Sequence, residues 1–171
     1  MEPFIVGGKK ARIKEFPHSV LLKISCINKF TELEAAWICG ASIINQKISL
    51  TAAHCLHECN HKSTVISSMG HAHKERGAIS RVMYYLLHEK YDYIRITNDI
   101  GLVKHKTAIQ FNHKVKRVAL MRNPPYSEKA QIAGWGMTNV RYMLDEFKMN
   151  EYSYSLPKSM SNRAKLIYSS R

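Results

Sequence analysis

The sequence predicts an all-β protein, and two observations carry that prediction. Its apolar runs are short, and turn-forming residues separate them at close intervals, which is typical of a barrel or sandwich of short strands. Apolar residues make up 45% and charged residues 23% of the 171 residues, which is a globular composition. No apolar run approaches the roughly 18 residues that a membrane span needs, so we expect no membrane partner.

The expected strands follow one another along the first two thirds of the chain. Val20–Ile24 is a compact apolar run, and the apolar stretch 37–44 is predicted to break at Gly40. Asn45–Lys47 has turn composition. Beyond it we expect strands over 48–50, 79–87, 100–104 and 131–136.

The chain between the last two expected strands has a different character. Residues 112–125 combine weak periodicity, many basic residues and Pro124-Pro125, which predicts a connector between two units. Beyond Gly136 the pattern weakens, and residues 159–171 fit either a short helix or an irregular end.

The positive charge is unevenly distributed. The chain has a net charge of +13, and residues 100–171 alone carry 13 basic and 4 acidic residues. Such a stretch favours acidic partners in principle. The basic residues concerned are Lys104, Lys106, Lys114, Lys116, Arg117 and Arg122. They form no nucleic-acid motif and enclose only one aromatic residue, Phe111. We therefore expect a solvated basic face and no specific nucleic-acid partner.

All four cysteines lie between Cys26 and Cys59, and the other two are Cys39 and Cys55. Disulfides would imply an oxidising compartment. The first residues, however, have neither the basic head nor the apolar core of a signal peptide. We expect either a protein that stays inside the cell or a chain whose true N-terminus is missing.

Two segments place titratable residues at the ends of expected strands. His54 follows two alanines, whose small side chains let neighbouring backbone approach while the imidazole projects outward. Asp99 precedes the apolar strand 100–104, where its carboxylate can be buried and then needs a partner. An imidazole is a natural partner, because the carboxylate fixes its tautomer and stabilises its cationic form. Either residue alone is more often structural.

Five segments occur together in one order: Ile5-Val6-Gly7-Gly8, the stretch ICGASII at 38–44, LTAAHC at 50–55, NDIGL at 98–102 and AGWG at 133–136. Over residues 5–136 the chain resembles the chymotrypsin/trypsin family of serine proteases. The resemblance implies a chymotrypsin-like double antiparallel β-barrel, with the first barrel complete and the second partial. It implies an N-terminal segment over 1–15, a first barrel over 16–111, a connector over 112–130 and a truncated second barrel over 131–171.

The resemblance also implies roles for individual residues. His54 matches the general base that takes the proton of the nucleophile, and Asp99 matches the buried acid that orients it. Ile5 matches the N-terminus that an activating cleavage frees, although Phe4 rather than Lys or Arg precedes it. A disulfide between Cys39 and Cys55 is implied as well.

Cys26 and Cys59 have no place in the basic family pattern. We expect a second bridge between the loop after the Val20–Ile24 strand and the loop after His54. The alternative is that both are free thiols.

The nucleophile of the family mechanism is missing. The family supplies it from a Gly-Asp-Ser-Gly-Gly turn, and no glycine follows Gly136 in this chain. The serines beyond that point lack the glycine setting: Ser153, Ser155, Ser159, Ser161, Ser169 and Ser170. Loss of the nucleophile costs on the order of a millionfold in kcat. We expect a fragment of a serine-type endopeptidase, or an inactive form, with no peptidase activity as written.

The alternative is a non-catalytic protease homologue that acts as a secreted binding or regulatory protein. The family resemblance implies protein or peptide substrates or inhibitors as partners, no cofactor, and an extracellular location that the cysteines also favour. We expect a monomer or an aggregation-prone fragment, because a partial barrel exposes strand edges.

A zinc site is a competing interpretation of the cluster His54, Cys55, His57, Cys59 and His61. Zinc accepts Cys and His ligands, but the spacing lacks the paired ligand pattern of structural zinc sites. We therefore expect no metal.

Overall fold

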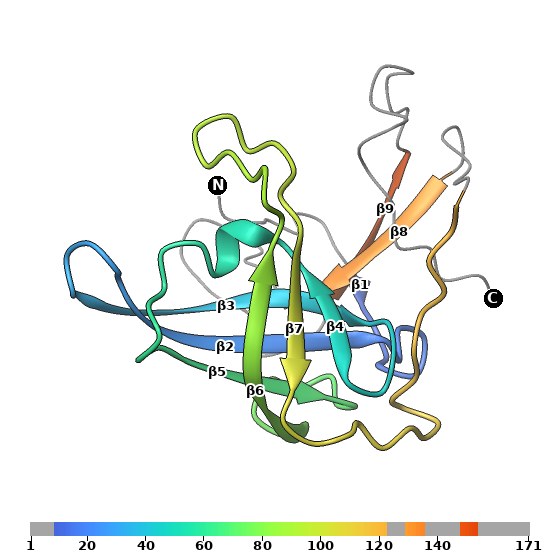
Figure 1. Cartoon of the computed structure of the whole chain (residues 1–171). Coiled ribbons are helices and arrows are strands. Elements are labelled where there is room, and N and C mark those ends of the chain that lie inside the picture. Colours follow the sequence, from blue (N-terminus) through green and yellow to red (C-terminus); the bar gives the residue numbers. More distant parts are fainter. Residues whose placement is uncertain (1–8, 123–128, 136–147, 154–171) are drawn as a thin grey trace.

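The computed structural model describes residues 9–122, 129–135 and 148–153. Six strands form a closed antiparallel barrel in the order β2-β3-β4-β7-β6-β5 (Figure 1). Their bounds are β2 Ser19–Ile27, β3 Glu34–Ile43, β4 Ile48–Thr51, β5 Thr64–Met69, β6 Ala78–Leu87 and β7 Gly101–His105. The predicted all-β fold with a closed first barrel is therefore confirmed.

A second, three-stranded antiparallel sheet has the order β1-β9-β8. Its strands are β1 Lys9–Lys10, β8 Lys129–Gly134 and β9 Lys148–Ser153. Figure 1 shows β8 and β9, in orange and red, to one side of the barrel. In the described ranges the helical content is the 3-10 turn η1, Ala53–Cys55, and no helix there could span a membrane.

The apolar run that predicts β2 is buried on both of its faces. Val20, Leu22 and Ile24 point into the barrel and are at most 2% exposed. Leu21 faces the other way and packs with Phe16 and Trp135 in a separate cluster against the second sheet. A strand buried on both faces loses the alternation of apolar and polar residues, which is why this segment is continuously apolar.

Three details of the barrel differ from the sequence expectations, and β1 and β9 of the second sheet were not expected either. The predicted break at Gly40 is wrong, because β3 continues through it and Gly40 pairs with Leu21. β5 was not expected, since Ser67 and Ser68 are polar yet buried in it. The imperfect alternation in β6 has a structural cause: the pairing with β7 shifts by one residue at a bulge between Val82 and Tyr84.

The pairing of β4 with β7 decides where the sequence motifs meet. The register places Thr51, the last residue of β4, opposite Gly101, the first residue of β7. The two strands are antiparallel, so the chain that leaves β4 and the chain that enters β7 lie at the same end of the barrel. His54 and Asp99 belong to those two connections.

Candidate active site

His54 is held by a short turn with buried neighbours. The hydroxyl of Thr51 donates a hydrogen bond to the Gly40 carbonyl at 2.8 Å, which ties the end of β4 to β3. The chain then enters η1, where Ala53 and Cys55 are 0% and 3% exposed. Because both neighbours point inward, the imidazole of His54 points outward, and half of its side chain is exposed.

Asp99 is placed by the connection that precedes β7. Asn98 adopts a left-handed conformation with φ of 53°, and its side-chain amide donates to the Lys90 carbonyl at 2.8 Å. Asn is among the residues that tolerate this conformation best. At Gly101 an added Cβ would lie 3.4 Å from the Ala52 carbonyl oxygen, so the two connections pack closely.

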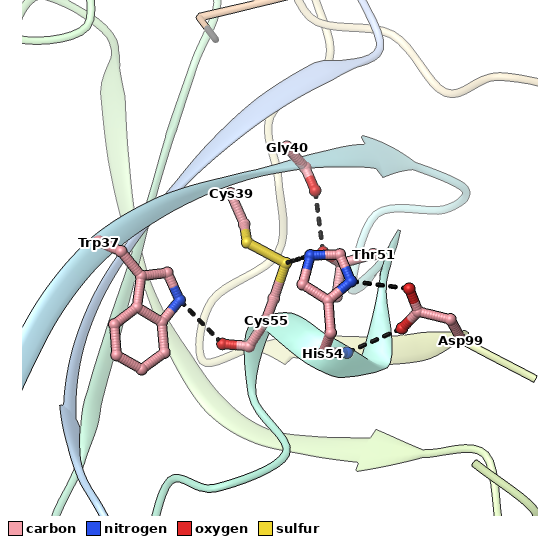
Figure 2. A network of polar contacts seen from close by, with 7 residues as sticks. All are labelled: Trp37, Cys39, Gly40, Thr51, His54, Cys55 and Asp99. Atoms are coloured by element: carbon pink, nitrogen blue, oxygen red, sulfur yellow. Dashed lines mark hydrogen bonds and ion pairs between the residues drawn. A yellow bond between two sulfur atoms is a disulfide. The ribbon is translucent and has the colours of Figure 1, made fainter. Parts of the chain in front are cut away.

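The carboxylate of Asp99 accepts two hydrogen bonds from His54 (Figure 2). The backbone N–H of His54 donates to Oδ1 at 2.8 Å, and Nδ1 lies 2.7 Å from Oδ2. A carboxylate only accepts, so the neutral imidazole carries its proton on Nδ1. Nε2 then keeps a lone pair, which is the form that a general base needs.

On the Nε2 side of the ring lies a disulfide. Cys55 Sγ is 3.6 Å from His54 Nε2, and Cys55 is bonded to Cys39 of β3. The indole N–H of Trp37 donates to the Cys55 carbonyl at 3.1 Å, which adds a second link between β3 and η1. Within the part of the chain that the structure describes, no serine hydroxyl hydrogen-bonds to Nε2.

The second disulfide joins Cys26 and Cys59, and no cysteine is free. Cys26 lies within β2 rather than in the loop after it. Asn28 and Cys59 also form an isolated β-bridge, so the bond fastens the segment after η1 to the β2–β3 hairpin.

A metal site would compete for the same atoms. Ligand atoms of Cys39, His54 and Cys55 lie within 4.8 Å of one another. The two sulfurs are bonded to each other and therefore offer no thiolate. This leaves His54 alone in the group as a ligand, and its Nδ1 is already hydrogen-bonded to Asp99.

An aromatic cluster connects the two loops that carry His54 and Asp99, and the sequence motifs gave no sign of it. The ring of His57 stacks on Tyr93 at 5.3 Å between centroids and meets Tyr91 edge-on at 5.2 Å. Burial, followed by the negative charge of Asp99, raises the pKa of the Tyr91 hydroxyl. In the sequence, only the closely spaced tyrosines of 91–93 point to this cluster. Their partner His57 lies far away in the sequence, so the contact could not be predicted.

The outer sequence motifs and the basic stretch after β7 differ in how much of them the structure describes. Ile5 and Gly136 lie outside the described residues, whereas Trp135 is buried and donates from Nε1 to the Ala72 carbonyl at 2.8 Å. The basic stretch after β7 packs against the barrel through Val115 and Val118, which are 3% and 6% exposed.

A closed antiparallel barrel that carries a paired His and Asp at one end is an arrangement found in the chymotrypsin-like class of serine proteases. The family model described as Trypsin matches residues 5–166. The chain therefore belongs to the trypsin family, as the sequence motifs predicted. The match extends beyond Gly136, farther than the motifs do.

The chain spans about half the length of the curated relatives that it matches. It is 30% identical over 139 residues to hypodermin-B of Hypoderma lineatum, which covers 81% of this chain and 51% of that protein. It is 29% identical over 133 residues to trypsin delta of Drosophila erecta, covering 77% and 49%.

Solved structures share the fold at low identity. The scabies mite inactivated protease paralogue S-D1 superposes with a TM-score of 0.74 at 18% identity, covering 87% of this chain and 62% of that chain. A structure titled HL collagenase has a TM-score of 0.71 at 22% identity, covering 86% and 62%.

Proposed function

We propose that the chain carries the base and the acid of a serine-type endopeptidase, with His54 as general base and Asp99 as the carboxylate that orients it. The contact of 2.7 Å between Nδ1 and Oδ2 carries this proposal. Because Asp99 accepts a hydrogen bond from Nδ1–H, the lone pair on Nε2 is available to remove a proton from a hydroxyl. The second contact, from the backbone N–H, holds the carboxylate in place while the ring changes charge.

The nucleophile and the oxyanion donors would have to come from a turn that this sequence lacks, since no glycine follows Gly136. We therefore expect these 171 residues alone to hydrolyse no peptide bond. The substrate class of the complete function is protein or peptide, by family membership. In that function Ile5 would be the N-terminus that cleavage frees.

Activity assays on two proteins test the proposal. The chain and its His54→Ala variant are incubated with casein and with peptide esters, and neither is expected to show turnover. Turnover in the chain that is lost in the variant would overturn the expected inactivity.

A chimera then tests the roles of His54 and Asp99 directly. It joins residues 1–134 to the remaining part of a trypsin, which supplies the missing serine turn. We expect hydrolysis that falls by several orders of magnitude on His54→Ala. Equal hydrolysis with and without His54 would refute its role as general base.

A second candidate is a non-catalytic homologue that binds proteins or peptides. Two observations favour it: Nε2 faces Cys55 Sγ at 3.6 Å, and the fold is shared with a protein described as an inactivated protease paralogue. The chimera separates the candidates, because an inactive chimera that still binds a peptide inhibitor would support the binding role. Either role suits a secreted monomer, and the two disulfides support this location.

A further inference from the structure

A second histidine is enclosed inside the barrel, away from the candidate active site. His105, the last residue of β7, is 1% exposed. Its Nε2 lies 2.9 Å from Ser49 Oγ of β4, and its Nδ1 lies 3.1 Å from Ser67 Oγ of β5. Both serines are fully buried. Three strands thus meet at one imidazole.

The protons in this cluster can be assigned from the hydrogen bonds. Ser67 Oγ donates its single proton to the Ser80 carbonyl at 2.8 Å. Toward His105 the same oxygen must therefore accept, which places a proton on Nδ1. Nε2 then has a lone pair and accepts from the hydroxyl of Ser49. A neutral imidazole with its proton on Nδ1 satisfies every one of these contacts.

Burial inside the barrel opposes a second proton on His105 as well. The charged and titratable groups on the barrel strands and the residues next to them, besides His105 itself, are His18, Lys23, Glu34, Lys47, Arg81, Tyr84, Tyr85, His88, Lys104 and Lys106. The acid among them, Glu34, is exposed and accepts from Ser25 Oγ. The Lys47 carbonyl accepts the His105 N–H at 2.8 Å, and the Arg81 carbonyl accepts that of Lys106 at 2.8 Å. The ring partners of His105 are two neutral serine hydroxyls, so no carboxylate compensates an added proton there, and burial lowers the pKa of His105.

We propose that His105 makes the first barrel, and with it the His54–Asp99 pair, acid-labile. Protonation of His105 puts a buried positive charge, with no carboxylate among its ring partners Ser49 and Ser67, at the point where β4, β5 and β7 meet, and so favours opening of the barrel. Two of these strands position the pair, because β4 leads into His54 and β7 begins directly beyond Asp99. The proposal concerns this geometry and stands whether or not the chain hydrolyses peptides.

The direction of the pH effect follows from proton linkage. The unfolded chain protonates His105 near pH 6.5, whereas the folded chain keeps it neutral to lower pH. The contribution of neutral, buried His105 to the free energy of unfolding is therefore complete above about pH 6.5, and it is lost as the pH falls below that value. One such proton changes the unfolding equilibrium constant by up to about tenfold per pH unit. Burial also lowers the pKa of His18, which acts in the same direction.

The test compares variants, so that the contribution of His18 cancels. Urea unfolding of the disulfide-bonded 171-residue chain is measured from about pH 8 to pH 5, together with His105→Leu and His113→Leu. His113 is exposed and serves as the matched control. Between pH 6 and pH 5 the unfolding constant should rise up to about tenfold more in the parent and in the control than in His105→Leu. The same pH dependence in all three proteins would overturn the proposal.

Histidine nitrogen resonances of the parent protein give a second readout that needs no variant. We expect His105 to remain neutral and protonated on Nδ1 until the barrel opens. The Nδ1–H signal of His54 should disappear over the same pH range. A proton on Nε2 of His105 would contradict the proposal, as would titration of His105 near pH 6.5 with the His54 signal intact.

Discussion

The closed barrel and the three-stranded sheet differ in whether they leave strand edges unpaired. Every strand of the barrel is hydrogen-bonded on both sides, so closure leaves no edge. In the described part of the second sheet, β8 pairs with β9 alone, and β1 contributes two residues. Both disulfides and both members of the His54–Asp99 pair belong to the barrel or to its connections.

We expect the barrel to hold the site geometry by itself, while the second sheet depends on docking. That docking runs through Trp135, which packs with Leu21 and Phe16 on the outer face of the barrel. Substitutions in the two regions should then change stability as in separate units.

The largest effect is expected in the barrel interior. Leu22 is 0% exposed, so Leu22→Ala removes buried methyl groups and leaves a cavity, at a cost of about 4 kcal/mol in the free energy of unfolding. The matched change in the second sheet, Ile132→Ala, removes a side chain that is 38% exposed and should cost less than about 1 kcal/mol. Urea unfolding measures both. Equal losses would mean that the two sheets share one core.

The next effect concerns the disulfides. Replacing Cys39 and Cys55 by alanine should cost about 3 kcal/mol, because it frees a loop with a sequence separation of 16. Replacing Cys26 and Cys59, with a separation of 33, should cost about 0.6 kcal/mol more from loop closure alone. Both losses are measured by urea unfolding.

The two bridges should differ in their effect on the site. Cys55 directly follows His54, so loss of the Cys39–Cys55 bond should weaken the Nδ1–H signal of His54 more than loss of the other bond. If the weakening of the His54 Nδ1–H signal followed only the free energy of unfolding that each variant loses, the Cys39–Cys55 bridge would have no local role at the site.

The sequence predicted the barrel and the site pair for different reasons. Five of the six barrel strands were predicted because their apolar residues form short runs between turns, as in β2 and β7. His54 and Asp99 were identified only because family motifs placed them, and the structure brings their atoms to 2.7 Å.

The missed strand β5 and the wrongly predicted break at Gly40 both have physical causes. β5 was missed because Ser67 is turned inward, where His105 and the Ser80 carbonyl satisfy its hydroxyl. An apolar pattern cannot reveal a polar residue whose partner lies on another strand. Gly40 was read as a break, yet strand pairing with Leu21 supports it. Contacts of this kind depend on register, which the sequence pattern leaves open.

The two tryptophans give the smallest and most selective test. Each donates its indole N–H to a backbone carbonyl: Trp37 to Cys55 within the barrel, at 3.1 Å, and Trp135 to Ala72 across the docking contact, at 2.8 Å. Replacing either by Phe removes one hydrogen bond, worth about 1 kcal/mol. Trp135→Phe should therefore speed amide hydrogen exchange in β8 about fivefold and leave β2 unchanged.

Trp37→Phe should show the opposite pattern, because its contact lies within the barrel. We expect faster amide hydrogen exchange in β3 and η1. Exchange in β8 should change only as far as the global stability of the protein falls. If Trp135→Phe instead sped exchange in β2 as much as in β8, the second sheet would be part of the cooperative unit of the barrel. The His54–Asp99 geometry would then depend on the docking contact at Trp135 as well as on the pairing of β4 with β7.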